Sequence, residues 1–84
     1  MITHCEYMNG ISFQLVFENG LNLSIIQHDG SYSCDKTAEV AVIHTANDEF
    51  VTKDFIKDLD DDVKGWVDAE ELADLIFEVK NWSN

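Results

Sequence analysis

Two segments of alternating hydrophobicity flank residues 18–20, Glu-Asn-Gly, and their parity limits how this chain can fold. Residues 11–18 and 21–27 place apolar side chains at every second position, which is typical of half-buried strands. A two-residue loop would pair apolar with polar residues, whereas a three-residue loop aligns the apolar faces. The sequence therefore predicts an antiparallel hairpin with Gly20 in the left-handed conformation of a bulged turn. The predicted cross-strand pairs are Phe17 with Leu21, Leu15 with Leu23 and Phe13 with Ile25.

Two further elements are expected after the hairpin. Residues 38–44 are apolar on both faces, which is typical of a strand that is covered on both sides or central in its sheet. Residues 50–59 have a short strand at Phe50-Val51 as one alternative for their start, but Phe55, Ile56 and Leu59 at helical spacing favour a short helix capped by Thr52 or Asp54. The polar residues 28–36 form a loop long enough to carry a binding surface.

The strongest helical pattern covers residues 69–81. Asp68 as N-cap with Glu71 three residues later forms a capping box, and Val67 can pack against Leu72 as a hydrophobic staple. The apolar residues fall on one stripe, which is expected to pack on the sheet. The stripe consists of Leu72, Leu75, Ile76, Val79 and Trp82.

These elements predict one α+β domain over residues 1–84: an antiparallel meander of three to four strands, with the C-terminal helix packed on one face and a short helix before it. A chain of 84 residues buries only roughly 60–65% of its unfolded surface, which leaves little volume for a deep cleft. Residues 1–9 show little pattern and are expected to be loosely ordered. Met8 directly precedes the first strong strand, so Met1 and Met8 are both candidates for the natural start.

Charge is the most unusual feature of the composition, with 17 Asp and Glu against five Lys and no Arg, a net charge of −12. Such a surface repels phosphate groups, so the chain is not expected to bind nucleic acid directly or to adsorb to anionic membranes. A basic protein surface and a divalent cation remain as attractive partners, and solubility alone is the alternative reason for the charge. The composition does not decide the oligomeric state, and a homodimer is compatible with it.

The sequence contains no recognisable catalytic machinery. Ser31 and Ser33 lie in no nucleophile elbow, and there is no glycine-rich phosphate loop, so the chain is not expected to be an enzyme or to hold a cofactor. Neither a signal peptide nor a run of ~20 apolar residues is present, which predicts a cytoplasmic protein. Cys5 and Cys34 are therefore expected to be reduced.

Residues 60–71 resemble an EF-hand calcium loop. Asp60 and Asp62 stand at the first and third positions and Glu71 at the twelfth, where that loop supplies carboxylate oxygens, and glycine stands at the sixth. Lys64 departs from the pattern, because the fifth position normally donates an oxygen. The staple and the capping box already explain the end of the motif without a metal. Calcium binding through Asp60, Asp62 and Glu71 is therefore an alternative, and no metal site is favoured.

Residue type alone suggests a zinc site as a further alternative, since the sequence holds two Cys and three His. The candidates lack a closely spaced Cys or His pair, and in a meander the two His would end strands at opposite ends of the sheet. Surface or edge histidines are the favoured interpretation. These candidates are Cys5, His28, Cys34 and His44.

The acidic charge is concentrated in the second half of the chain, where residues 48–84 carry a net −8 against −4 for residues 1–47. Clustered carboxylates can imitate a phosphate array, occupy the basic groove of a nucleic-acid-handling protein and steer association with it. The sequence therefore favours a non-enzymatic protein-binding module. The candidate interaction residues are Asp54, Asp58, Asp60, Asp61 and Asp62.

The order of motifs from about residue 10 to residue 80 resembles small uncharacterised acidic proteins of tailed bacteriophages. The motifs are Phe17-Glu18-Asn19-Gly20, His28-Asp29-Gly30-Ser31-Tyr32, Glu39-Val40-Ala41-Val42, Asp62-Val63-Lys64-Gly65-Trp66 and the helix that begins Glu70-Glu71-Leu72. The resemblance carries no activity or site residues. It implies only a context, that of a phage accessory factor for host takeover or anti-defence in the host cytoplasm, where small acidic proteins can act as DNA mimics and inhibitors.

Overall fold

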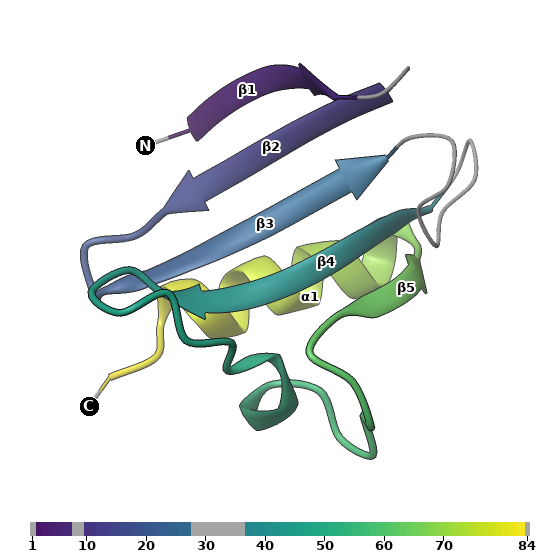
Figure 1. Cartoon of the computed structure of the whole chain (residues 1–84). Helices are drawn as coiled ribbons and strands as arrows, with labels where there is room; N and C mark the ends of the chain where they lie inside the picture. Colours follow the sequence, from purple (N-terminus) through teal and green to yellow (C-terminus); the bar gives the residue numbers. More distant parts are fainter. Residues whose placement is uncertain (1, 8–9, 28–36, 84) are drawn as a thin grey trace.

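A five-stranded antiparallel sheet carries one α-helix on one of its faces (Figure 1). The structure, a computed structural model, describes residues 2–7, 10–27 and 37–83. The predicted α+β meander with a C-terminal helix is confirmed. The elements are β1 (Ile2–Tyr7), β2 (Gly10–Val16), β3 (Leu21–Gln27), β4 (Ala38–His44), the 3-10 helix η1 (Thr52–Asp54), β5 (Lys64–Val67) and α1 (Ala69–Lys80), with the strands adjacent in chain order.

The β2–β3 hairpin has the register that the parity of its sequence predicts. Phe13 pairs with Ile25 and Leu15 with Leu23, and Phe17 N donates to the carbonyl of Leu21 at 2.9 Å. Gly20 adopts a φ of +88°, the left-handed conformation that the three-residue loop requires. The predicted bulged turn is therefore confirmed.

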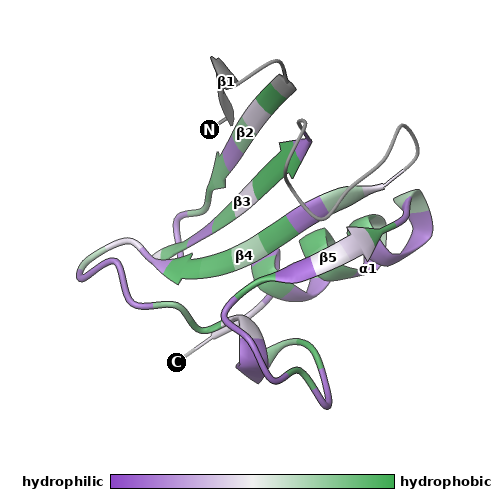
Figure 2. Cartoon of the chain, turned by 45° about the vertical axis from the view of Figure 1, so that its right-hand side comes forward, coloured by the Kyte–Doolittle hydropathy of each residue, from purple (hydrophilic) through white to green (hydrophobic). Residues whose placement is uncertain are grey.

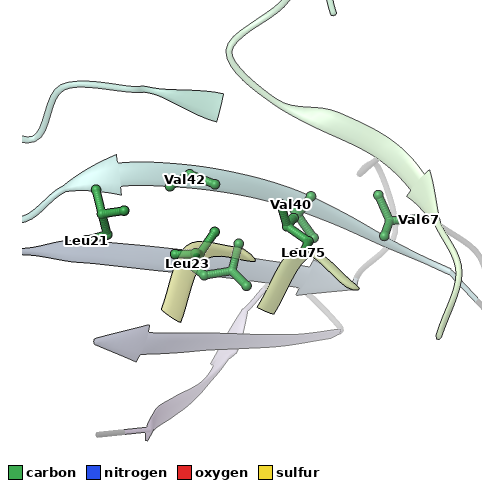
Figure 3. Close-up of a cluster of buried hydrophobic side chains, with 7 residues drawn as sticks. Leu21, Leu23, Val40, Val42, Val67 and Leu75 are labelled. Atoms are coloured by element: carbon green, nitrogen blue, oxygen red, sulfur yellow. The ribbon is translucent and has the colours of Figure 1, made fainter. Parts of the chain in front are cut away.

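The core lies between the sheet and α1 (Figure 3). β3 and β4 lie in the middle of the sheet and supply its most deeply buried side chains, because they are paired on both sides and covered by the helix. The predicted stripe of α1 faces this cluster, with Leu75 and Val79 buried and its other members half-buried. The cluster consists of Leu21, Leu23, Val40, Val42, Val67, Leu75 and Val79.

Side chains close both ends of α1. Asp68 is the N-cap, as predicted, and its Oδ1 accepts from Glu71 N at 2.9 Å. At the other end, Asn19 in the hairpin turn donates to the carbonyls of Val79 at 2.7 Å and Trp82 at 3.1 Å. The Asn19 amide thus satisfies carbonyls that a helix end leaves without partners, and it ties the hairpin to the helix.

β1 and β5 lie at the two edges of the sheet and extend the predicted meander. The sequence predicts neither strand. β1 pairs with β2 over six residues although residues 1–9 carry no strand pattern. β5 pairs with β4 through a β-bulge, so that Gly65 and Trp66 both face Glu39. An edge strand pairs on one side only, so its own residues need not alternate strongly between apolar and polar.

The structure has a short helix within residues 50–59, as predicted, but the predicted cap is wrong. Only Thr52–Asp54 is helical, the N-cap position is Val51, and no side chain caps it. Thr52 does not act as a cap because its hydroxyl is bonded to β4 and to the carbonyl of Asp62. The apolar side chains that suggested a helix, among them Phe55 and Ile56, still pack against the core from a chain of turns.

Candidate functional site

The five predicted interaction residues lie on one stretch of chain that begins within η1 and ends before β5, called here the acidic segment and defined as residues 53–62. In Figure 1 this stretch lies across the sheet from β1. All five carboxylates are exposed: Asp54, Asp58, Asp60, Asp61 and Asp62. The structure therefore keeps them on one segment and leaves them available to a partner.

Thr52 anchors the acidic segment to the sheet. Its side chain is 1% exposed, its Oγ1 accepts from Val42 N at 2.9 Å, and its hydroxyl donates to the carbonyl of Asp62 at 2.6 Å. The hydroxyl thus occupies the edge of β4 where β5 no longer pairs, and it holds both ends of the segment together. Sequence reasoning missed this role, since it assigned Thr52 to a helix cap.

Two local features shape the acidic segment between Thr52 and Asp62. Asp58 adopts a φ of +62°, a left-handed conformation that Asp tolerates better than most residues. Asp61 Oδ1 accepts from Asp62 N at 2.7 Å, a side-chain bond that favours a turn over a helix. Both features oppose the helical course that the apolar spacing suggested, and the acidic segment after η1 is a loop.

Trp66 is the second candidate feature and was not predicted as a site residue. It is 58% exposed, and its φ of +57° is unusual for a bulky side chain. The β-bulge opposite Glu39 imposes this conformation. Backbone strain of this kind, held in place by the surrounding structure, is frequent at functional sites, and exposed Trp side chains often anchor protein interfaces. The sequence signal that could have identified Trp66 is its position as a large apolar residue directly after Gly65.

The acidic charge extends over the whole second half of the chain. All twelve Asp and Glu residues of positions 48–84 are exposed. Figure 2 shows that much of the segment between β4 and β5 is hydrophilic, whereas β3 and β4 are mostly hydrophobic. The half of the molecule around α1, η1 and β5 therefore carries a strongly negative field over an ordered frame.

The structure does not assemble the EF-hand-like calcium site that the sequence offers as an alternative. Among the residues that the structure describes, no three His, Cys, Asp or Glu side chains gather where they could hold a metal, so Asp60, Asp62 and Glu71 do not form a site. The reason is that residues 64–67 pair with β4 as an extended strand, which separates the first positions of the motif from Glu71 in α1.

The side chains of three of the four zinc candidates lie outside what the structure describes. His28, Cys34 and the rest of loop 28–36 lie outside the described residues, as does the side chain of Cys5. His44 is half-buried at the end of β4, and its ring packs edge-on against Trp82 with the centroids 6.0 Å apart. This contact gives His44 a structural role.

Comparison of the chain with models of protein families, with curated proteins and with solved structures found no match. The resemblance to phage proteins stays a prediction. Within the described part of the chain, no helix has the length and apolar character to cross a membrane.

Proposed function

We propose that the chain is a non-enzymatic, acidic protein-binding module that engages a basic surface of a partner protein. The observation that carries this proposal is the display of five exposed carboxylates on one segment that Thr52 anchors to the sheet. Because the anchor limits the motion of the segment, less conformational entropy is lost when a partner binds it. Trp66 supplies an exposed aromatic group in β5, the strand that follows the acidic segment and precedes α1.

The charge pattern also supports a partner that normally binds nucleic acid. Closely spaced carboxylates present a negative array that a phosphate-binding groove can accept, and steering by the net charge of −12 accelerates the encounter. In this proposal the module acts in the cytoplasm and inhibits the partner by occupying its basic groove. The sequence resemblance makes it an accessory factor of a phage, acting in the cytoplasm of the host.

The test compares wild type with a variant in affinity capture from a bacterial lysate. This four-fold variant carries four substitutions at once: Asp58→Asn, Asp60→Asn, Asp61→Asn and Asp62→Asn. We expect the variant to fold, since exposed charges contribute little to stability, and to lose the captured partner. Wild-type capture should fall between 0.1 M and 1 M salt, because the Debye length shrinks from about 10 Å to about 3 Å.

A matched control removes four exposed charges elsewhere, through Glu18→Gln, Asp48→Asn, Glu49→Gln and Glu70→Gln. The control should retain most of the partner, because it leaves the acidic segment intact. Thermal unfolding of all three proteins verifies that folding is preserved. A partner that binds wild type and the four-fold variant equally at every salt concentration would show that the segment serves solubility alone.

A further inference from the structure

A groove lies between α1 and the residues that follow η1. Its floor is apolar and is formed by Phe55, Ile56, Val67 and Leu75. The cavity has a volume of about 250 Å³, whereas small-molecule sites usually enclose ~300–1,000 Å³. The groove therefore has the size of a side chain of a partner protein rather than of a cofactor or a substrate.

Charged groups line the groove along its helical wall. Glu71, Asp74 and Glu78 all border it, and their spacing of three and four residues places them on one flank of α1 over about 10 Å. Lys57 is the one cation among the described residues that line it. Three carboxylates against one ammonium group leave the groove negative. A long cationic side chain can lay its methylene groups on an apolar floor while its charged head stays near carboxylates.

We propose that this groove binds an arginine side chain from a basic segment of a partner protein. The proposal rests on the proposed function, because it assigns a pocket to the basic partner that the acidic surface attracts. Arginine fits better than lysine for two reasons. Its planar guanidinium group can bond a carboxylate through two nitrogens, and it stacks on aromatic rings. Phe55 offers such a ring, held by an edge contact with Trp82 at a centroid distance of 6.4 Å.

A second copy of the chain does not suit the groove. The sequence contains no Arg, and each copy carries a net charge of −12, so two copies repel one another before a contact forms. The charge complementarity of the groove thus selects a basic partner over self-association. Sedimentation of the protein alone should show no dimer that depends on the residues of the groove.

The direct test is a titration of isotope-labelled protein with three short peptides, followed by the backbone amide signals in NMR spectra. The first peptide is capped, consists of Ala and Ser, and carries two arginines; the second and third have lysine or citrulline in their place. We expect saturable shifts at residues 55–57 and 71–78, with the arginine peptide binding roughly threefold to tenfold more tightly than the lysine peptide. The uncharged citrulline peptide should not saturate.

Substitutions in the groove make the test specific. The triple variant Glu71→Gln, Asp74→Asn and Glu78→Gln should bind the arginine peptide about tenfold more weakly, as expected for the loss of three exposed carboxylates that attract the guanidinium groups. A control with three exposed charges removed outside the groove, Asp48→Asn, Glu49→Gln and Glu70→Gln, should change binding less than about twofold, because only the screened general field is reduced.

Two single variants probe the floor and the competing cation. Lys57→Gln should strengthen binding, because it removes a positive charge from the groove. Phe55→Leu keeps an apolar floor but removes the ring, so the preference for arginine over lysine should shrink to the part that bidentate bonding to the carboxylates supplies.

Three results would overturn the inference. Equal weakening by the triple variant and its control would show that only net charge matters. Peptide-induced shifts confined to residues 58–62 would leave the proposed function standing without the groove. The absence of any saturable shift would refute arginine binding in the groove. The proposed function would then still be tested independently by the capture experiment in lysate.

Discussion

Replacement of Thr52 by Val should destabilise the protein although the two side chains have the same shape. The hydroxyl accepts from Val42 N at 2.9 Å and donates to the carbonyl of Asp62 at 2.6 Å, and both Thr52 and Val42 are at most 1% exposed. In the variant the Val42 amide has no partner and no access to water. A buried donor left without a partner costs about 1–3 kcal/mol, whereas the Asp62 carbonyl, only partly buried, can turn to water.

We therefore expect Thr52→Val to lower the free energy of unfolding by about 2 kcal/mol. For a domain of this size such a loss lowers the melting temperature by roughly 8–16 °C. Thr52→Ser keeps the hydroxyl and loses one methyl group, so it should cost only about 1 kcal/mol. Urea unfolding followed by the fluorescence of Trp66 and Trp82 measures both variants. If Thr52→Val proves as stable as wild type, or more stable than Thr52→Ser, the anchoring role assigned to the hydroxyl is wrong.

Three further substitutions test other features by thermal unfolding. Asn19→Asp should destabilise more than Asn19→Ala, because a carboxylate cannot donate to the carbonyls at the end of α1 and places a negative charge there; the reverse order would contradict the capping role. Gly20→Val should cost roughly 1 kcal/mol more than Gly20→Asn, since an added Cβ meets no atom within 4 Å and only the positive φ opposes it; equal losses would refute this. Trp66→Asn should unfold at a higher temperature than Trp66→Val, because Asn tolerates the left-handed conformation, and the opposite order would show that the bulge relaxes.

The central elements of the fold could be predicted because their signals are local. Alternation and loop parity predict the β2–β3 pairing down to the register of Leu15 with Leu23. The capping box predicts the start of α1 at Asp68, and the apolar stripe predicts which side of the helix is buried. These signals depend on residues that are close to one another in the chain, so a single sequence is sufficient to show them.

The candidate site was predicted only in part. The exposure of the acidic residues follows from their charge, and the structure confirms it for all five. The sequence signal for Trp66 is only its position directly after Gly65, and the groove beside α1 has no sequence pattern of its own. Trp66 depends on a bulge that forms only when β5 meets β4, and the groove depends on Phe55 and Leu75, which are far apart in the chain, lining the same cavity.

By itself, the sequence determined an acidic α+β chain with a bulged hairpin and an amphipathic C-terminal helix, because alternation, parity and capping act within a few residues. Only the tertiary structure decided the course of residues 50–67. There the local helical spacing favours a helix, but hydrogen bonds between distant residues determine the structure. These are the bond of the Thr52 hydroxyl to Val42 and the pairing of β5 with the edge of β4. The physical reason is that a buried backbone amide such as that of Val42 needs a partner, and the residue that supplies it lies ten positions away.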